Sequence, residues 1–186
     1  MTWAKALNRR DFLTVGGAAA AMVLNPLPAW AAFRDLLKPV RKLTFYNTHT
    51  DERLSVRYYI NGKYDRKALS DINYILRDHR TDDIFDIDRS LLDLLYAISV
   101  KTRSHAATFE VISGYRSPAT NALLHKKSRG VATKSLHMLG KAIDIRLSGH
   151  DTRRLHKTAV KLKGGGVGFY PKSDFVHVDV GSVRYW

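Results

Sequence analysis

Two short segments in the last third of the chain alternate strictly between apolar and polar residues. In residues 142–147 isoleucine and leucine occupy every second position, and Asp144 lies between them. In residues 175–180 valine occupies every second position, and His177 and Asp179 lie between. A period of two is typical of a β-strand with one buried face. Both segments are therefore predicted to be strands that carry their polar side chains on the face turned away from the core.

The rest of the chain predicts further strands and several helices around this pair. Segments rich in β-branched and aromatic residues predict strands at 42–48, 54–60 and 108–112. Capping residues and helical spacing of apolar residues predict helices at 65–78, from 88 onward, at 117–126 and at 152–163. We therefore expect an α+β fold in one domain, with helices packed on one side of a small antiparallel sheet and polar groups on its other face.

A third metal-competent side chain precedes the first of the two strands. His137 lies seven residues before Asp144, and Gly140 between them would let the loop fold back toward the carboxylate. The chain has no cysteine, so any metal must be bound by histidine and carboxylate. Two imidazoles and one carboxylate suit Zn²⁺ with a water as fourth ligand, which is the chemistry of peptide hydrolysis. The same three residues could instead each serve a local structural role, and their spacing alone does not decide between these alternatives.

The first 31 residues predict export. Arg9 and Arg10 precede a short apolar run, and a small-residue cleavage motif ends at Ala31. A membrane anchor is the alternative, but the run is short for a span and prolines follow it. We expect a twin-arginine signal peptide at 1–31, a mature chain of 32–186 in the periplasm and no membrane span after processing. Because the chain carries a net charge of +14, a polyanionic partner is expected, and export favours a wall polymer over nucleic acid.

Several motifs resemble a known family. The pattern Ser135-x-His137-x2-Gly140-x-Ala142-x-Asp144, followed by His177, resembles the M15 zinc peptidases. The segments 113–118, 165–170 and 174–179 are similar to the YcbK-type branch of that family, and the similarity extends from about residue 43 to 186. The resemblance implies that His137, Asp144 and His177 are zinc ligands.

The same resemblance implies roles for three more residues. Asp174 stands where the dipeptidase branch has a glutamate general base, and its side chain is one methylene shorter. Arg116 stands where that branch has an arginine that stabilises the oxyanion or binds a substrate carboxylate. Ser135 would donate to substrate or orient the loop. The alternatives are a turn residue at position 174 and a surface ion pair at position 116. Asp179 shares the face of His177 and is expected to support that imidazole.

The function implied is a zinc-dependent murein endopeptidase acting on peptide cross-links, of the 3-3 type that joins two diaminopimelates. Two alternatives remain open. One is a D-Ala carboxypeptidase or dipeptidase, and the other is an inactive module that binds the wall. The sequence does not indicate an oligomeric state.

Overall fold

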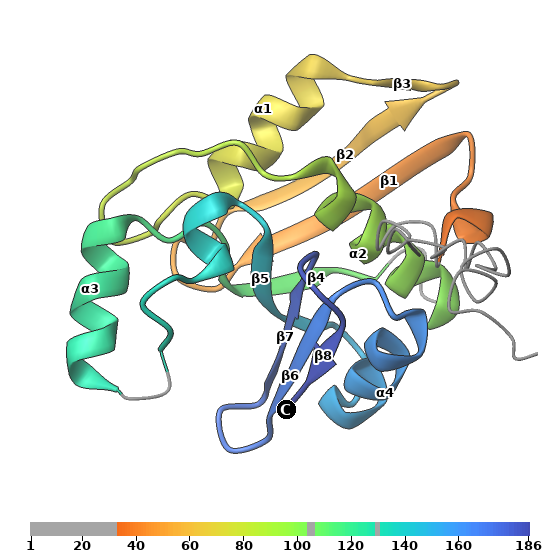
Figure 1. The fold of residues 1–186 in the computed structure, drawn as a ribbon. Helices are drawn as coiled ribbons and strands as arrows, with labels where there is room; N and C mark the ends of the chain where they lie inside the picture. The colour runs from red at the N-terminus through yellow and green to blue at the C-terminus, as the bar shows by residue number, and fades with distance from the viewer. Residues whose placement is uncertain (1–32, 104–106, 129–130) are drawn as a thin grey trace, which may run out of the picture.

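One mixed β-sheet runs through the part of the chain that the computed structural model describes, residues 33–103, 107–128 and 131–186. Its eight strands in these residues lie in the order β3-β2-β1-β4-β5-β7-β6-β8 (Figure 1). They are β1 Val40–Asn47, β2 Arg53–Ile60, β3 Lys63–Tyr64, β4 Phe109–Ser113, β5 Ala142–Leu147, β6 Gly166–Tyr170, β7 Phe175–Asp179 and β8 Arg184–Tyr185. The expected α+β class is confirmed. The neighbouring pairs are antiparallel apart from β1 with β4 and β6 with β8, and these two parallel pairs make the sheet mixed.

Helices begin where the sequence places capping side chains. The described helices are α1 Arg66–Ile75, α2 Arg89–Lys101, α3 Pro118–Lys127 and α4 Thr152–Leu162, with the 3-10 turns η3 Arg34–Leu36 and η4 Leu136–Leu139. The side chains that accept hydrogen bonds from first-turn backbone N–H groups of the four α-helices belong to Asp65, Asp88, Ser117 and Asp151. Each such bond satisfies one of the unpaired donors at a helix start. The predicted helix starts are therefore confirmed.

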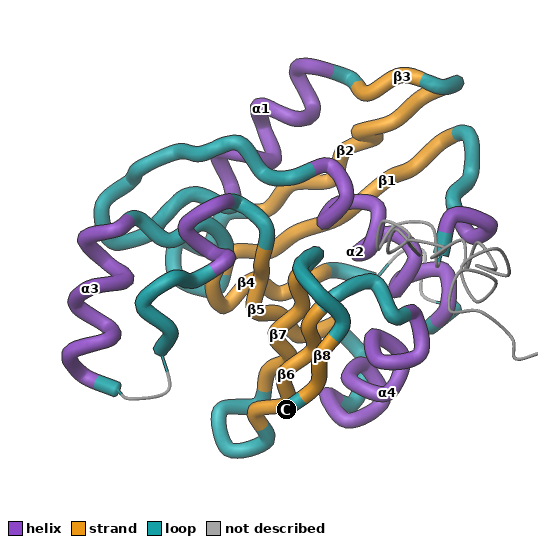
Figure 2. Tube along the Cα trace, viewed as in Figure 1, coloured by secondary structure: helices purple, strands orange, loops and turns teal. Residues whose placement is uncertain are grey.

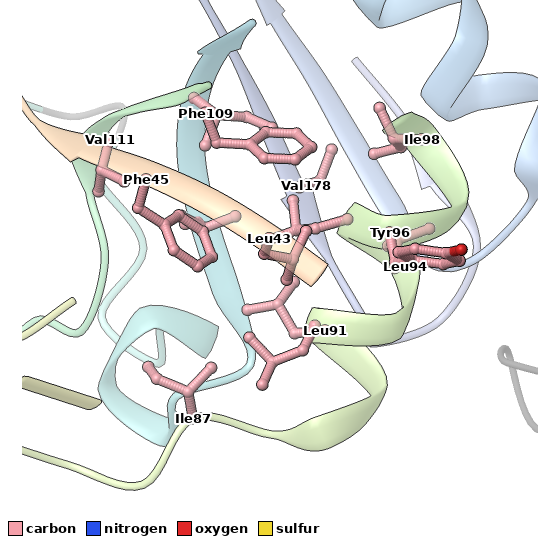
Figure 3. Close-up of a cluster of buried hydrophobic side chains, with 14 of the residues drawn as sticks. Leu43, Phe45, Ile87, Leu91, Leu94, Tyr96, Ile98, Phe109, Val111 and Val178 are labelled. Atoms are coloured by element: carbon pink, nitrogen blue, oxygen red, sulfur yellow. The ribbon is translucent and has the colours of Figure 1, made fainter. Parts of the chain in front are cut away.

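The core lies on one face of the sheet. Figure 3 shows Leu43 and Phe45 of β1 and Phe109 of β4 packed beside Leu91 and neighbouring side chains of α2. Helices α1 and α4 contribute buried residues to the same cluster, whereas none of the described residues of α3 belongs to it. Figure 2 shows α3 apart from α1, α2 and α4. Three of the four helices thus cover the core face, as expected.

The opposite face of the sheet carries polar side chains. Register pairs on this face join Tyr46 to Arg53 and Asp144 to His177. Within the described residues no helix is long and apolar enough to cross a membrane. The predicted signal peptide at 1–31 lies outside the described residues.

Candidate metal centre

Two strands and one 3-10 turn bring His137, Asp144 and His177 together. Asp144 of β5 and His177 of β7 are directly opposite one another in the antiparallel register. His137 lies in η4, which ends at Gly140 in the left-handed conformation with φ 64°. A Cβ at Gly140 would also lie 2.2 Å from the backbone oxygen of Asp86, so only glycine fits this position. The predicted fold-back of the loop is confirmed, and it directs His137 at the strand pair.

The donor atoms of the three side chains form a compact triangle. His177 Nδ1 lies 2.9 Å from Asp144 Oδ1, and His137 Nε2 lies 3.3 Å from His177 Nδ1 and 3.4 Å from Asp144 Oδ1. Two ligands of a tetrahedral zinc ion, each about 2.0–2.1 Å from the metal, are about 3.3 Å apart. Among the residues that the structure describes, this is the one group of three or more such side chains close enough to hold a metal ion. Its spacing fits zinc.

The remaining ring nitrogens are occupied in a way that leaves these donors free for a metal. His137 Nδ1 donates to the backbone oxygen of Gly114 at 2.8 Å. His177 Nε2 lies 3.0 Å from Oδ2 of Asp179, whose side chain is fully buried. A carbonyl or carboxylate behind an imidazole fixes its tautomer and orientation in metal sites. The expected support of His177 by Asp179 is present in the structure.

The charged groups in this cluster strongly shift one another's pKa values. Burial alone would raise the pKa of Asp144, but attraction and hydrogen bonds from His137 and His177 hold that pKa well below its usual range. Burial alone would lower the pKa of His177, yet the hydrogen bonds that its ring makes to the carboxylates of Asp144 and Asp179 raise it to about 9. The pKa of Asp179 falls to about 2 because its hydrogen bond with His177 and three further donors outweigh its burial. Without metal, the imidazole of His177 therefore holds a proton that a metal must displace.

Arg116 is largely buried beside the cluster and is not an exposed surface residue. Its side chain is 11% exposed, and its Nη2 lies 3.5 Å from Oδ2 of Asp144 and donates to Ser113 Oγ at 3.3 Å. Desolvation by burial lowers the pKa of this guanidinium. Among the described residues, no hydrogen-bond partner meets Arg116 Nε, which is also buried. A buried N–H without a partner is costly, so this group is suited to an incoming acceptor oxygen.

A cavity of about 270 Å³ opens at the triangle. His137, Asp144 and His177 line it together with Arg116 and Ser135, two further residues that the sequence analysis singled out. Sequence reasoning missed the rest of the lining, which includes the cations Lys134 and Arg184 and the aromatic residues Tyr170, Phe175 and Trp186. No pattern in the sequence marks residues 184–186 as a strand, because the two-residue β8 is too short to show a period.

The structure does not bring Asp174 into this cavity. Its side chain is 64% exposed, and the residue has a positive φ of 51° in the turn between β6 and β7. Its carboxylate accepts a hydrogen bond from Thr152 Oγ1 and lies 3.4 Å from Arg146 Nε. These are the contacts of a turn residue that ties the β6–β7 hairpin to the start of α4.

His49, two residues after the end of β1, also lies outside the triangle. Its ring stacks on His79 with centroids 3.8 Å apart, and its Nε2 lies 3.1 Å from the backbone oxygen of Ile112. These contacts give His49 a structural role after the end of β1.

Comparison with known proteins identifies the family. Residues 36–186 match the family described as peptidoglycan L,D-endopeptidase MepK. The chain belongs to this family of M15 peptidases. It is 40% identical to the probable peptidoglycan L,D-endopeptidase MepK of Haemophilus influenzae, over 96% of this chain and 95% of the relative. It is 39% identical to the peptidoglycan L,D-endopeptidases MepK of Escherichia coli and Shigella flexneri, over 96% of this chain and 97% of each relative. No solved structure matches the chain with significance.

Proposed function

We propose that this chain is a zinc-dependent peptidoglycan endopeptidase that hydrolyses peptide cross-links of murein in the periplasm. The observation that carries the proposal is the triangle of His137, Asp144 and His177 at a cavity, in a chain that belongs to the MepK family. Membership of a peptidase family supports hydrolysis, and the names of the relatives support peptidoglycan as the substrate.

Each residue of the site has a proposed task. His137, Asp144 and His177 hold the ion, while Gly114 and Asp179 orient the two imidazoles. Zinc, when bound, would supply an acidified water and polarise a carbonyl. Arg116 offers its unpartnered Nε–H to a carbonyl or carboxylate oxygen of the substrate. Ser135 caps η4 and accepts from the backbone N–H of His137, so it orients the ligand loop.

The proposed substrate is the 3-3 cross-link between two diaminopimelates. Such a bond places a free carboxylate on each side of the scissile amide. Three cations line the cavity, Arg116, Lys134 and Arg184, and they complement those carboxylates. We expect 3-3 dimers to be converted to monomers faster than 4-3 dimers.

Digestion of purified murein by the metal-loaded protein tests this function directly. The fragments are identified by mass after incubation with untreated, chelated and zinc-restored protein. We expect about one zinc per chain, loss of activity on chelation and recovery with Zn²⁺. Full activity of the demetallated protein would contradict the zinc mechanism. Fastest release of D-Ala from uncross-linked stems would identify a carboxypeptidase instead, and binding without cleavage would identify a wall-binding module.

Asp174 stays a prediction as general base, and the variant Asp174→Asn tests it. If its carboxylate reaches the site in the substrate complex, turnover should fall ~10²–10⁴-fold with zinc retained. Thr152→Ala is the matched control, because it removes a hydrogen-bond partner of Asp174 while leaving the carboxylate. Near-normal turnover in Asp174→Asn would leave this residue with the structural role that its present contacts describe.

We also propose that residues 1–31 are a twin-arginine signal and that 32–186 form the mature peptidase domain. The proposal rests on Arg9, Arg10 and the small-residue motif that ends at Ala31.

A further inference from the structure

An aromatic wall stands on one side of the cavity. Its members are Tyr170, the last residue of β6, Phe175, the first residue of β7, and Trp186, which follows β8. Tyr170 and Phe175 are cross-strand partners, and their rings stack with centroids 4.5 Å apart at 17°. The wall thus joins three segments of the sheet.

Trp186 is held in a fixed orientation although it is 48% exposed. Its indole Nε1–H donates to Tyr170 Oη at 2.8 Å. Its backbone N–H donates to Val167 and its carbonyl accepts from Phe169, so both neighbours on β6 anchor it. The Arg184 guanidinium lies 5.1 Å from the indole centre. A large apolar ring that is both exposed and immobilised is prepared for contact with a ligand at little further entropic cost.

Gly168 supports this reading independently. A Cβ at this position would lie 2.6–2.8 Å from three atoms of the indole. Gly168 sits in the regular antiparallel register opposite His177, and it is not among the glycines with positive φ. The backbone therefore does not require glycine here, whereas the indole does. Because Gly168 has no side chain, the indole of Trp186 can lie directly against β6.

The wall lies beside the proposed metal site. The indole centroid of Trp186 is 5.3 Å from the ring centroid of His177, a proposed zinc ligand. A substrate residue that flanks the scissile bond must therefore pass along this surface. We propose that Trp186, supported by Tyr170, is a specificity-determining residue that packs against the methylene chain of a diaminopimelate adjacent to the scissile bond. This inference rests on the proposed function, since it names what that same site recognises.

The test compares cross-linked dimers that differ by one side chain. Synthetic 3-3 dimers carry either two diaminopimelates or a single replacement. The replacement is alanine on the carbonyl side in one analogue, and on the amine side in the other it is 2,3-diaminopropionate, which keeps the amine of the cross-link and shortens the chain. Each lost methylene in an apolar contact lowers kcat/KM by ~10-fold or more. For one of the two analogues we expect the wild-type protein to favour the unmodified dimer by ~10-fold or more in kcat/KM. Trp186→Ala should lose most of that discrimination, and Trp186→Phe should retain most of it. Gly168→Ala keeps the indole but places a methyl group where the indole lies, so the ring must move and the same discrimination should be lost.

Tyr185→Ala is the matched control. Tyr185, the last residue of β8, precedes Trp186, but its hydroxyl donates to Val160 of α4 and it does not line the cavity. This variant should keep the wild-type discrimination, and zinc content is measured for every variant. Unchanged discrimination in Trp186→Ala, or an equal loss of rate on all dimers in Trp186→Ala and Tyr185→Ala, would overturn the inference. Failure of the wild-type protein to cleave any dimer would instead overturn the proposed function.

Discussion

At the scale of single residues, the candidate site depends on which nitrogen of each imidazole is free. His137 presents Nε2 and His177 presents Nδ1, because a carbonyl and a carboxylate occupy the other two nitrogens. Alternation in the sequence could place His177 and Asp144 on the polar face of their strands. It could not fix the register that sets them opposite one another, nor the contact of Asp179 with both His177 and Arg184. Those depend on how distant segments meet.

The raised pKa of His177 predicts competition between protons and metal. Without metal its pKa is about 9, because Asp144 and Asp179 hydrogen-bond the ring more than burial disfavours its charge. Between pH 7 and 9 zinc binding should therefore release about one proton per site, and the apparent affinity should rise about tenfold per pH unit before levelling near pH 9. Calorimetric titration with Zn²⁺ in two buffers of different ionisation enthalpy measures the released protons.

Asp179→Asn provides the control for this prediction. It removes one of the two carboxylates that raise the pKa of His177, so the affinity should level off at a lower pH than in wild type. An affinity that does not change between pH 7 and 9, with no proton released, would show that His177 is already neutral in the metal-free protein.

At the scale of elements, the sequence predicts where helices begin but not which strands pair with one another. Asp65, Asp88 and Ser117 each cap a helix with their own side chain, so these starts follow from adjacent residues. The parallel pairs of β1 with β4 and of β6 with β8 join strands separated by other elements, and β8 is only two residues long. No local pattern specifies such pairings. The same limit applies to Asp174, whose partners lie in β5 and at the start of α4.

A buried ion pair links α2 to the first strands, and its loss should lower the free energy of unfolding. Asp93 of α2 accepts hydrogen bonds from Arg41 at 2.5 Å, from Tyr58 at 2.9 Å and from Tyr64 at 2.8 Å. Asp93→Ala leaves the Arg41 guanidinium buried without its carboxylate, so the free energy of unfolding should fall by about 3–5 kcal/mol. Urea denaturation at fixed metal loading measures this change.

The double variant Arg41→Met/Asp93→Leu separates the unpaired charge from the loss of packing. Replacing both partners with apolar side chains should recover most of the stability that Asp93→Ala loses. If the free energy of unfolding of Asp93→Ala lay within about 1 kcal/mol of the wild-type value, water would have to reach Arg41 and compensate for the missing carboxylate.

At the scale of the whole molecule, the net charge of +14 is concentrated in part on one helix. The exposed side of α4 carries Arg153, Lys157 and Lys161 at successive four-residue intervals. Like charges at this spacing repel and disfavour the isolated helix. None of the three lines the cavity, so the metal site does not require them. An anionic polymer lying along α4 would relieve the repulsion, which connects the basic surface to the proposed substrate.

The row of Arg153, Lys157 and Lys161, here called the α4 ridge, predicts that the salt dependence of kcat/KM differs between intact murein and isolated dimers. Attraction between exposed charges is screened over about 10 Å at 0.1 M salt, so a polymer that contacts many cations loses more rate than a small dimer that occupies the cavity alone. We expect kcat/KM on intact murein to fall about tenfold between 50 and 500 mM NaCl, with a clearly smaller fall on isolated dimers. Lys157→Glu/Lys161→Glu should slow cleavage of intact murein at 50 mM NaCl, match wild type at 500 mM and leave dimer cleavage unchanged at both. If murein and dimers respond equally to salt and to this variant, the cations of the cavity attract the substrate and the α4 ridge has no part in it.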